Sequence, residues 1–309
     1  MRATPTLVGI LTLTAGIAVF SVQDVILKQL ADSYPLSQAM TIRSLVALPL
    51  MLWIVRWQDG GLHTLWTPGW RRMLGRGVLN VLAYTSYYLG LAVLPMATTV
   101  ALYFAAPLFI SLLAPLLLGE PAPRAARLAG LIGFAGVLLI VQPWAGEDAA
   151  LGMAALLPIL GAFGYALSMI AARPLGRTET AAAMACWGNI GFVAAALAMS
   201  AVFGGGSWAE GSPQVLQFLV RPWIWPTPAA LLGMAACGVI AAVGLTLLTQ
   251  AYRVAPGPLV APFEYSFMFW AVLFGWMFWD ELPDFWAWSG IALIVFAGLL
   301  VLRAAPKAP

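Results

Sequence analysis

The chain has 309 residues, of which 62% are hydrophobic and only 9% are charged, whereas about 25% of the residues of an ordinary soluble domain are charged. A water-soluble core of this size cannot bury so many apolar side chains, so the composition excludes a soluble globular protein. The net charge of +3 does not indicate a nucleic-acid partner, because the basic residues lie between apolar segments rather than in one patch.

Ten apolar segments follow one another along the chain, each long enough to cross about 30 Å of hydrocarbon. The first begins behind Met1-Arg2 and imitates a signal peptide, but its apolar run continues to Leu30 without a cleavage site. We therefore expect it to be retained as a span, and we predict an all-α integral membrane fold. The predicted helices are 7–31, 36–57, 73–94, 97–118, 125–143, 151–172, 179–203, 229–252, 257–279 and 284–303.

Basic residues are distributed unequally between the two sides of these spans. If the N-terminus is cytoplasmic, Arg221 is the one basic residue of the outer connections. The inner connections then carry Arg2, Arg56, Arg71, Arg72, Arg76, Arg124, Arg127, Arg173, Arg177, Arg253, Arg303 and Lys307. The positive-inside rule therefore predicts a multi-pass protein of the cell inner (plasma) membrane, in contact with lipid, with both termini cytoplasmic.

An internal repeat divides the chain into two units. Residues 95–120 align without a gap onto residues 256–281, so that Glu120 falls on Glu281 after a shift of 161 residues. The predicted units are 1–147 and 148–309, with five spans each. Because five is odd, the second unit must enter the membrane in the opposite orientation, which is an inverted-topology repeat typical of secondary transporters.

The same residues carry a family resemblance. Leu118-Gly119-Glu120-Pro121 is echoed by Trp279-Asp280-Glu281-Leu282, and with two five-helix halves the chain resembles the EamA-type members of the drug/metabolite transporter superfamily. The resemblance implies a central cavity lined mainly by the first four helices of each half, with the fifth at the periphery. Members of the superfamily move amino acids, amines, carboxylates, nucleotide-like metabolites and vitamins, so the cargo stays open.

An ionisable side chain near the middle of the membrane costs roughly 2.5–3.5 kcal/mol or more to insert, and four residues in the spans qualify: Asp24, Lys28, Arg43 and Glu264. Asp24 and Lys28 are four residues apart on one helical face, so they form a local pair or face the pathway. Arg43 and Glu264 approach the middle of the membrane, where they pair with each other or meet charges on the cargo. Our sharpest hypothesis is that Glu264 lies at the central cavity and pairs with a cationic group of the cargo or exchanges a proton.

One asparagine and three tyrosines form a stripe along one face of the third predicted helix. Asn80, Tyr84, Tyr87 and Tyr88 recur at helical spacing, and tyrosine in hydrocarbon needs a hydrogen-bond partner. We therefore favour cavity lining over core packing for this stripe and expect it to bind the cargo. The weaker candidates for the binding site are Gln23, Tyr103, Tyr165, Asn189 and Tyr265.

Prolines interrupt two repeat-related helices. Pro107 frees the carbonyl of Tyr103, whose counterpart in the second unit is Glu264, and Pro262 frees the carbonyl of Pro258. Broken helices at matching positions of two halves indicate a binding site in transporters.

The sequence contains little that indicates a catalytic site or a metal site. Cys186 and Cys237 lack metal-binding spacing, and His63 has no triad or metal partners in the sequence. We expect no cofactor, metal or catalytic residue. We predict a secondary transporter of a small organic metabolite that works by alternating access, with proton coupling or exchange left open. The alternative is an integral-membrane enzyme acting on a lipid or small molecule. The oligomeric state, monomer or homodimer, is left open.

Overall fold

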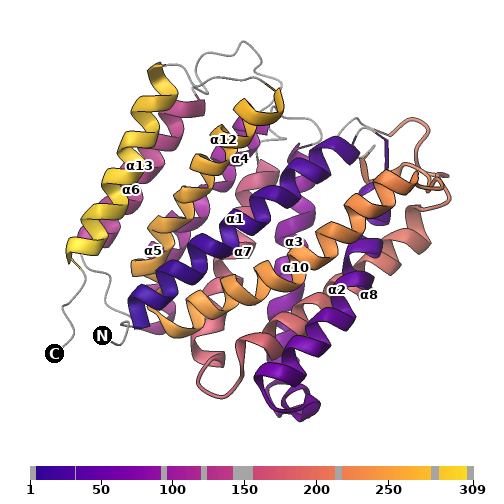
Figure 1. The fold of residues 1–309 in the computed structure, drawn as a ribbon, viewed down its shortest axis with the longest axis horizontal. Helices are drawn as coiled ribbons and strands as arrows, with labels where there is room; N and C mark the ends of the chain where they lie inside the picture. The colour runs from indigo at the N-terminus through magenta and orange to yellow at the C-terminus, as the bar shows by residue number, and fades with distance from the viewer. Residues whose placement is uncertain are drawn as a thin grey trace.

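The computed structural model describes residues 5–31, 33–91, 96–119, 124–141, 156–212, 218–279 and 285–304. Within these ranges the chain forms helices and connections without a β-strand (Figure 1). The helices are α1 (Pro5–Ala31), α2 (Leu36–Gln58), η1 (Leu62–Trp66), α3 (Trp70–Leu91), α4 (Met96–Tyr103), α5 (Ala105–Leu118), α6 (Arg124–Val141), α7 (Leu156–Leu175), α8 (Ala181–Phe203), α10 (Pro228–Val254), α11 (Gly257–Val260), η3 (Ala261–Ser266), α12 (Phe267–Trp279) and α13 (Phe285–Ala304). The all-helical prediction is confirmed over this part of the chain.

Each of the ten predicted segments contains helix, because backbone groups in hydrocarbon can satisfy their hydrogen bonds only within the segment. Among the described residues, six helical stretches are long and apolar enough to cross a membrane. Threonine caps set two of the starts: Thr180 accepts a hydrogen bond from the Ala183 amide at 3.1 Å, and Thr227 from the Ala230 amide at 3.2 Å. The repeat-defining Glu120 and Glu281, and the predicted unit boundary at 147, lie outside the described residues.

The interruptions expected at Pro107 and Pro262 are present. The predicted segment 97–118 is divided at Phe104 into α4 and α5, and the segment 257–279 changes from α11 to the 3₁₀ helix η3 before α12. The proline rings remove donors and clash with the preceding turn, which ends the regular helix. The two breaks are in contact with each other: the ring centroids of Phe104 and Tyr265 lie 5.6 Å apart.

The helices pack in pairs that join distant parts of the chain. α6 and α13 lie side by side at one edge of the molecule, whereas α2 and α8 pack together away from that edge (Figure 1). Between these pairs, α1 packs against α10 and α3 against α7. Small residues permit the closest approaches: a Cβ atom added to Gly238 on α10 would lie 2.6 Å from the carbonyl oxygen of Arg43 on α2.

Arg76 corrects one expectation about charge. We counted it among the basic residues of the inner connections, but it lies inside α3 and is only 2% exposed. Its Nε donates to the Ser168 carbonyl at 2.9 Å and its Nη2 to the Thr249 hydroxyl at 3.1 Å. The physical reason is that α7 and α8 pack against α3 and Thr249 of α10 reaches the guanidinium, so the position faces protein rather than water.

Candidate functional site

A cavity lies at the centre of the helix bundle. Its wall combines α1, α2, α3 and α4 with α7, α8, α10, η3 and α12, so helices from before and after residue 147 contribute. Of the described residues that line it, nine are aromatic. The cavity offers about 180 Å³ to water-sized molecules, and one water needs roughly 10–15 Å³ of such space. It can therefore hold several waters or a small organic molecule.

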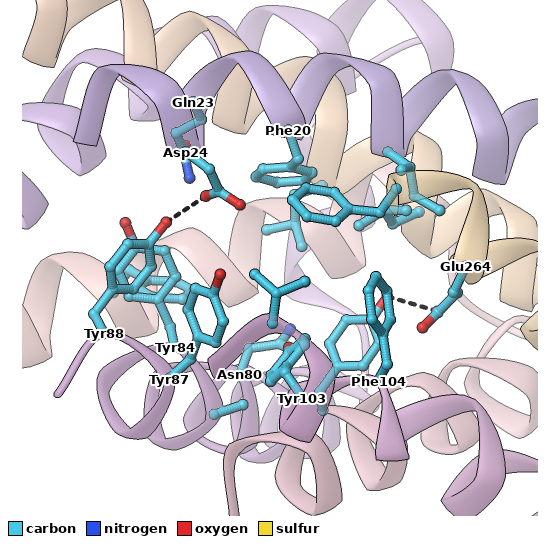
Figure 2. Close-up of a pocket in the computed structure, with 18 of the residues that line it drawn as sticks. Phe20, Gln23, Asp24, Asn80, Tyr84, Tyr87, Tyr88, Tyr103, Phe104 and Glu264 are labelled. Atoms are coloured by element: carbon cyan, nitrogen blue, oxygen red, sulfur yellow. Dashed lines mark hydrogen bonds between the residues drawn. The ribbon is translucent and has the colours of Figure 1, made fainter. Parts of the chain in front are cut away.

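The first pole of the cavity consists of side chains from α1, α2 and α3. The Tyr88 hydroxyl donates to Oδ1 of Asp24 at 2.6 Å, as Figure 2 shows. Arg43 is 3% exposed, and its Nε donates to Oε1 of Gln23 at 2.9 Å. Its guanidinium carbon also lies 4.9 Å from the ring centroid of Tyr84, which is within the range of a cation–π contact.

Glu264 forms the second pole, at the opposite side of the cavity from Asp24 (Figure 2). It is 7% exposed, and its Oε1 accepts hydrogen bonds from the hydroxyls of Tyr165 at 2.9 Å and Tyr252 at 2.5 Å. Placing Glu264 at the central cavity was the sequence hypothesis, and the carboxylate does line it. Its hydrogen-bonding partners are phenols rather than a basic side chain.

The static ion pair between Arg43 and Glu264, one of the two sequence interpretations, is not formed among the described residues. Arg43 donates to Gln23, whereas Glu264 accepts from tyrosines at the other pole. The two charges are separated because α2 and η3 approach the cavity from different sides. The pair proposed between Asp24 and Lys28 cannot be placed, because the Lys28 side chain lies outside the described part of the structure.

The aromatic stripe of α3 faces the cavity. Asn80, Tyr84, Tyr87 and Tyr88 all line it, together with Tyr103. The rings contact one another: centroids lie 4.3 Å apart for Tyr84 and Tyr88, and 4.8 Å apart for Tyr87 and Tyr103. The stripe therefore offers several aromatic surfaces to a bound molecule, and its role in binding stays a prediction.

Two weaker candidates lie elsewhere. Tyr265 is fully buried outside the cavity lining, and its hydroxyl donates to the Gly130 carbonyl on α6 at 3.1 Å. Its ring fills the space left by Gly133, where any Cβ atom would collide with it, so it joins η3 to α6 instead of facing the cargo. Asn189 likewise donates to the Ser44 carbonyl at 2.9 Å and does not line the cavity.

Sequence reasoning missed Tyr252 and the phenylalanines of the wall. Tyr252 is 1% exposed near the end of α10, and it reaches Glu264 because the chain turns back through Pro256 and Gly257 into α11 and η3. The sequence shows the turn-forming dipeptide Pro256-Gly257, but it does not show that the turn brings Tyr252 and Glu264 within hydrogen-bond distance. Phe20 and Phe192 line the cavity from α1 and α8, and in the sequence they do not differ from lipid-facing residues.

Comparison with known proteins extends these observations. Residues 7–142 match the EamA-like transporter family. A riboflavin transporter of Rhizobium johnstonii is 33% identical over 234 residues, covering 76% of this chain and 70% of the relative. A pseudopaline exporter of Pseudomonas aeruginosa is 26% identical over 295 residues, covering 96% of each chain. A solved crystal structure covers 99% of this chain and all of its own with a TM-score of 0.80 at 17% identity, which shows a shared fold.

Proposed function

Because the chain belongs to the EamA-like transporter family and is a transporter of a small metabolite, we propose that it carries a planar aromatic metabolite across the cell inner membrane by alternating access. The observation that carries the proposal is the aromatic wall of the central cavity. Flat π surfaces stack on planar rings, and convergent polar groups orient them. Riboflavin, named for the Rhizobium johnstonii relative, contains a planar aromatic ring system and is the first cargo to test. The family and its named relatives are transporters rather than enzymes.

Helix packing supports two inverted five-helix repeats, residues 1–147 and 148–309. Exchanging the two units turns α1 into α7, α2 into α8 and α3 into α10. The contact of α1 with α10 then becomes that of α7 with α3, and the contact of α2 with α10 becomes that of α8 with α3; all four are present. The pairs α2 with α8 and α6 with α13 map onto themselves, which is the pattern of a two-fold axis.

Two residue contacts support the position of that axis. Residues related by a two-fold axis touch each other only close to it. The Tyr265 hydroxyl is 3.4 Å from the Phe104 carbonyl, 161 residues earlier, which is the shift of the sequence repeat. Asn189 bonds to Ser44, 145 residues earlier, and the starts of α2 and α8 differ by the same number. A cavity at the interface of two such units can be exposed to either side in turn.

Counterflow in proteoliposomes tests the transport proposal. We expect labelled riboflavin to accumulate transiently in vesicles loaded with unlabelled riboflavin, and to be recovered chemically unchanged. The Tyr87→Ala variant should raise the riboflavin concentration at half-saturation roughly tenfold, because a ring contact contributes about 0.5–1.5 kcal/mol beyond the buried area. The control is Phe285→Ala, which removes a ring that is 76% exposed on α13. A covalently altered product would favour the membrane-enzyme alternative, and no uptake would contradict this cargo.

We also expect both termini in the cytoplasm. In Figure 1 the start of α1 and the end of α13 lie at the same end of the bundle. In the predicted topology, Arg221 is the one basic residue of the connections on the opposite side, and the other basic residues of the connections lie on the side of the termini. Reporter fusions after Pro309 and within residues 204–228 should report opposite sides of the membrane. A C-terminus outside the cytoplasm would contradict the predicted orientation, and two fusions on the same side would contradict the inverted five-helix repeat.

A further inference from the structure

Three polar atoms of the cavity wall lack a hydrogen-bond partner among the described residues. They are Nη1 of Arg43, Nδ2 of Asn80 and the hydroxyl oxygen of Tyr84, which lies near the Tyr88 hydroxyl without a hydrogen bond of good geometry, and each atom is buried. A buried donor without a partner costs about 1–3 kcal/mol, so most native proteins avoid it. Ser44, Arg76 and Ser266 also have such an atom, but none of these three residues lines the cavity.

The three unpartnered atoms belong to one wall. Asn80 and Tyr84 are four residues apart, so they lie on the same face of α3. Arg43 reaches this face from α2, with its guanidinium over the Tyr84 ring. Because its Nε is already bonded to Gln23, the guanidinium is held in place while Nη1 remains unpartnered. The wall is thus a preorganised set of donors.

The chemistry of these groups selects the complementary group on a ligand. The guanidinium and the amide nitrogen can only donate, and the phenol can donate its proton. Their partner must therefore be rich in acceptors. Asp24 is at the same pole and brings a carboxyl group next to the single arginine, so the pole does not carry an excess of positive charge. That balance favours neutral carbonyl oxygens over a carboxylate.

We infer that Arg43, Asn80 and Tyr84 form a subsite for a neutral, carbonyl-bearing edge of the aromatic cargo, such as the dione edge of a fused pyrimidine ring. The inference rests on the proposed aromatic cargo and deepens it by orienting that cargo. Its carbonyl edge faces α2 and α3, its rings stack on the tyrosine stripe, and its opposite end points toward Glu264.

Two tricyclic probes of similar shape test the subsite. Alloxazine carries a dione edge, whereas phenazine has three fused rings without carbonyl groups. Binding of each to the purified full-length protein in detergent is measured by equilibrium dialysis. We expect alloxazine to bind at least about tenfold more tightly than phenazine, since two or three hydrogen bonds at roughly 0.5–1.5 kcal/mol each separate them.

The variants Tyr84→Phe and Asn80→Leu each remove one donor with little change in shape. Each should weaken alloxazine binding by about threefold to tenfold and leave phenazine binding within about twofold. Tyr34→Phe is the matched control, because the Tyr34 hydroxyl lies outside the cavity lining and already accepts from the Thr227 amide at 3.1 Å. It should leave the ratio of the two affinities unchanged.

The outcomes separate this inference from the function on which it rests. Equal binding of alloxazine and phenazine to the wild-type protein, or equal losses of both in the two variants, would overturn the carbonyl subsite while leaving an aromatic cargo in place. Tighter binding of phenazine-1-carboxylate than of alloxazine would also overturn it, because the wall would then select an anion. If none of the three compounds binds, the aromatic cargo itself is wrong.

Discussion

We expect the Glu264→Gln protein to fold normally and to lose transport by about 10- to 100-fold, because hydrogen bonds to a charged group contribute about 1.5–3 kcal/mol each. Tyr165 and Tyr252 both donate to Oε1, and the carbonyl oxygen of glutamine can accept both hydrogen bonds, so the local packing survives. What disappears is the negative charge, and with it the ability to bind a cationic or donating group of the cargo or to carry a proton. Counterflow rates at several pH values measure the loss.

Two further variants test this prediction: one is a control, and the other distinguishes it from a static ion pair. Glu210→Gln removes a carboxylate from an exposed position in the connection after α8 and should leave transport unchanged. In Arg43→Gln/Glu264→Gln, a static ion pair would predict recovered stability, whereas the separate hydrogen bonds of Arg43 and Glu264 predict none. If residual flux no longer varies with pH, Glu264 exchanges protons. Normal kinetics together with a normal pH profile would show that it does neither.

Replacing Gly238 by Ala should lower the free energy of unfolding by about 1–3 kcal/mol, the usual cost of forcing extra atoms into a packed interface. The new Cβ atom would meet the Arg43 carbonyl oxygen at 2.6 Å and the Cβ atom of Val46 at 2.7 Å. One of these neighbours is backbone, so α10 and α2 must move apart. Because Arg43 lines the cavity, the displacement should also weaken cargo binding. Thermal unfolding in detergent measures the change in stability.

Gly75→Ala is the matched control for this substitution. It makes the same chemical change inside α3, where a Cβ atom would meet nothing within 4 Å. Alanine is preferred to glycine in a helix by roughly 0.8–1 kcal/mol, so this variant should be as stable as the wild-type protein or slightly more stable. Equal unfolding temperatures for the two variants would mean that α10 and α2 are not in close contact.

Much of the candidate site was readable from the sequence. The spacing of Asn80, Tyr84, Tyr87 and Tyr88 predicted one face of one helix, and the structure brings all four to the cavity. Ionisable residues in apolar segments drew attention to Asp24, Arg43 and Glu264 because hydrocarbon makes them costly, and these also line it. Transport of a small metabolite, predicted from repeats and resemblance, is confirmed by the relatives.

What the sequence by itself determined is the membrane-embedded, helical character of the chain and the approximate ends of its helices. Both follow from local chemistry, since a segment that enters hydrocarbon must satisfy its backbone internally. Tertiary structure alone decided which side chains meet: Arg43 with Gln23, Glu264 with Tyr165 and Tyr252, and Arg76 inside the bundle. Such contacts depend on how each helix is rotated and how closely it approaches partners far away in the chain. Lipid is as apolar as the packed side chains, so hydrophobic pattern does not encode that rotation; small residues, shape and hydrogen bonds between helices set it.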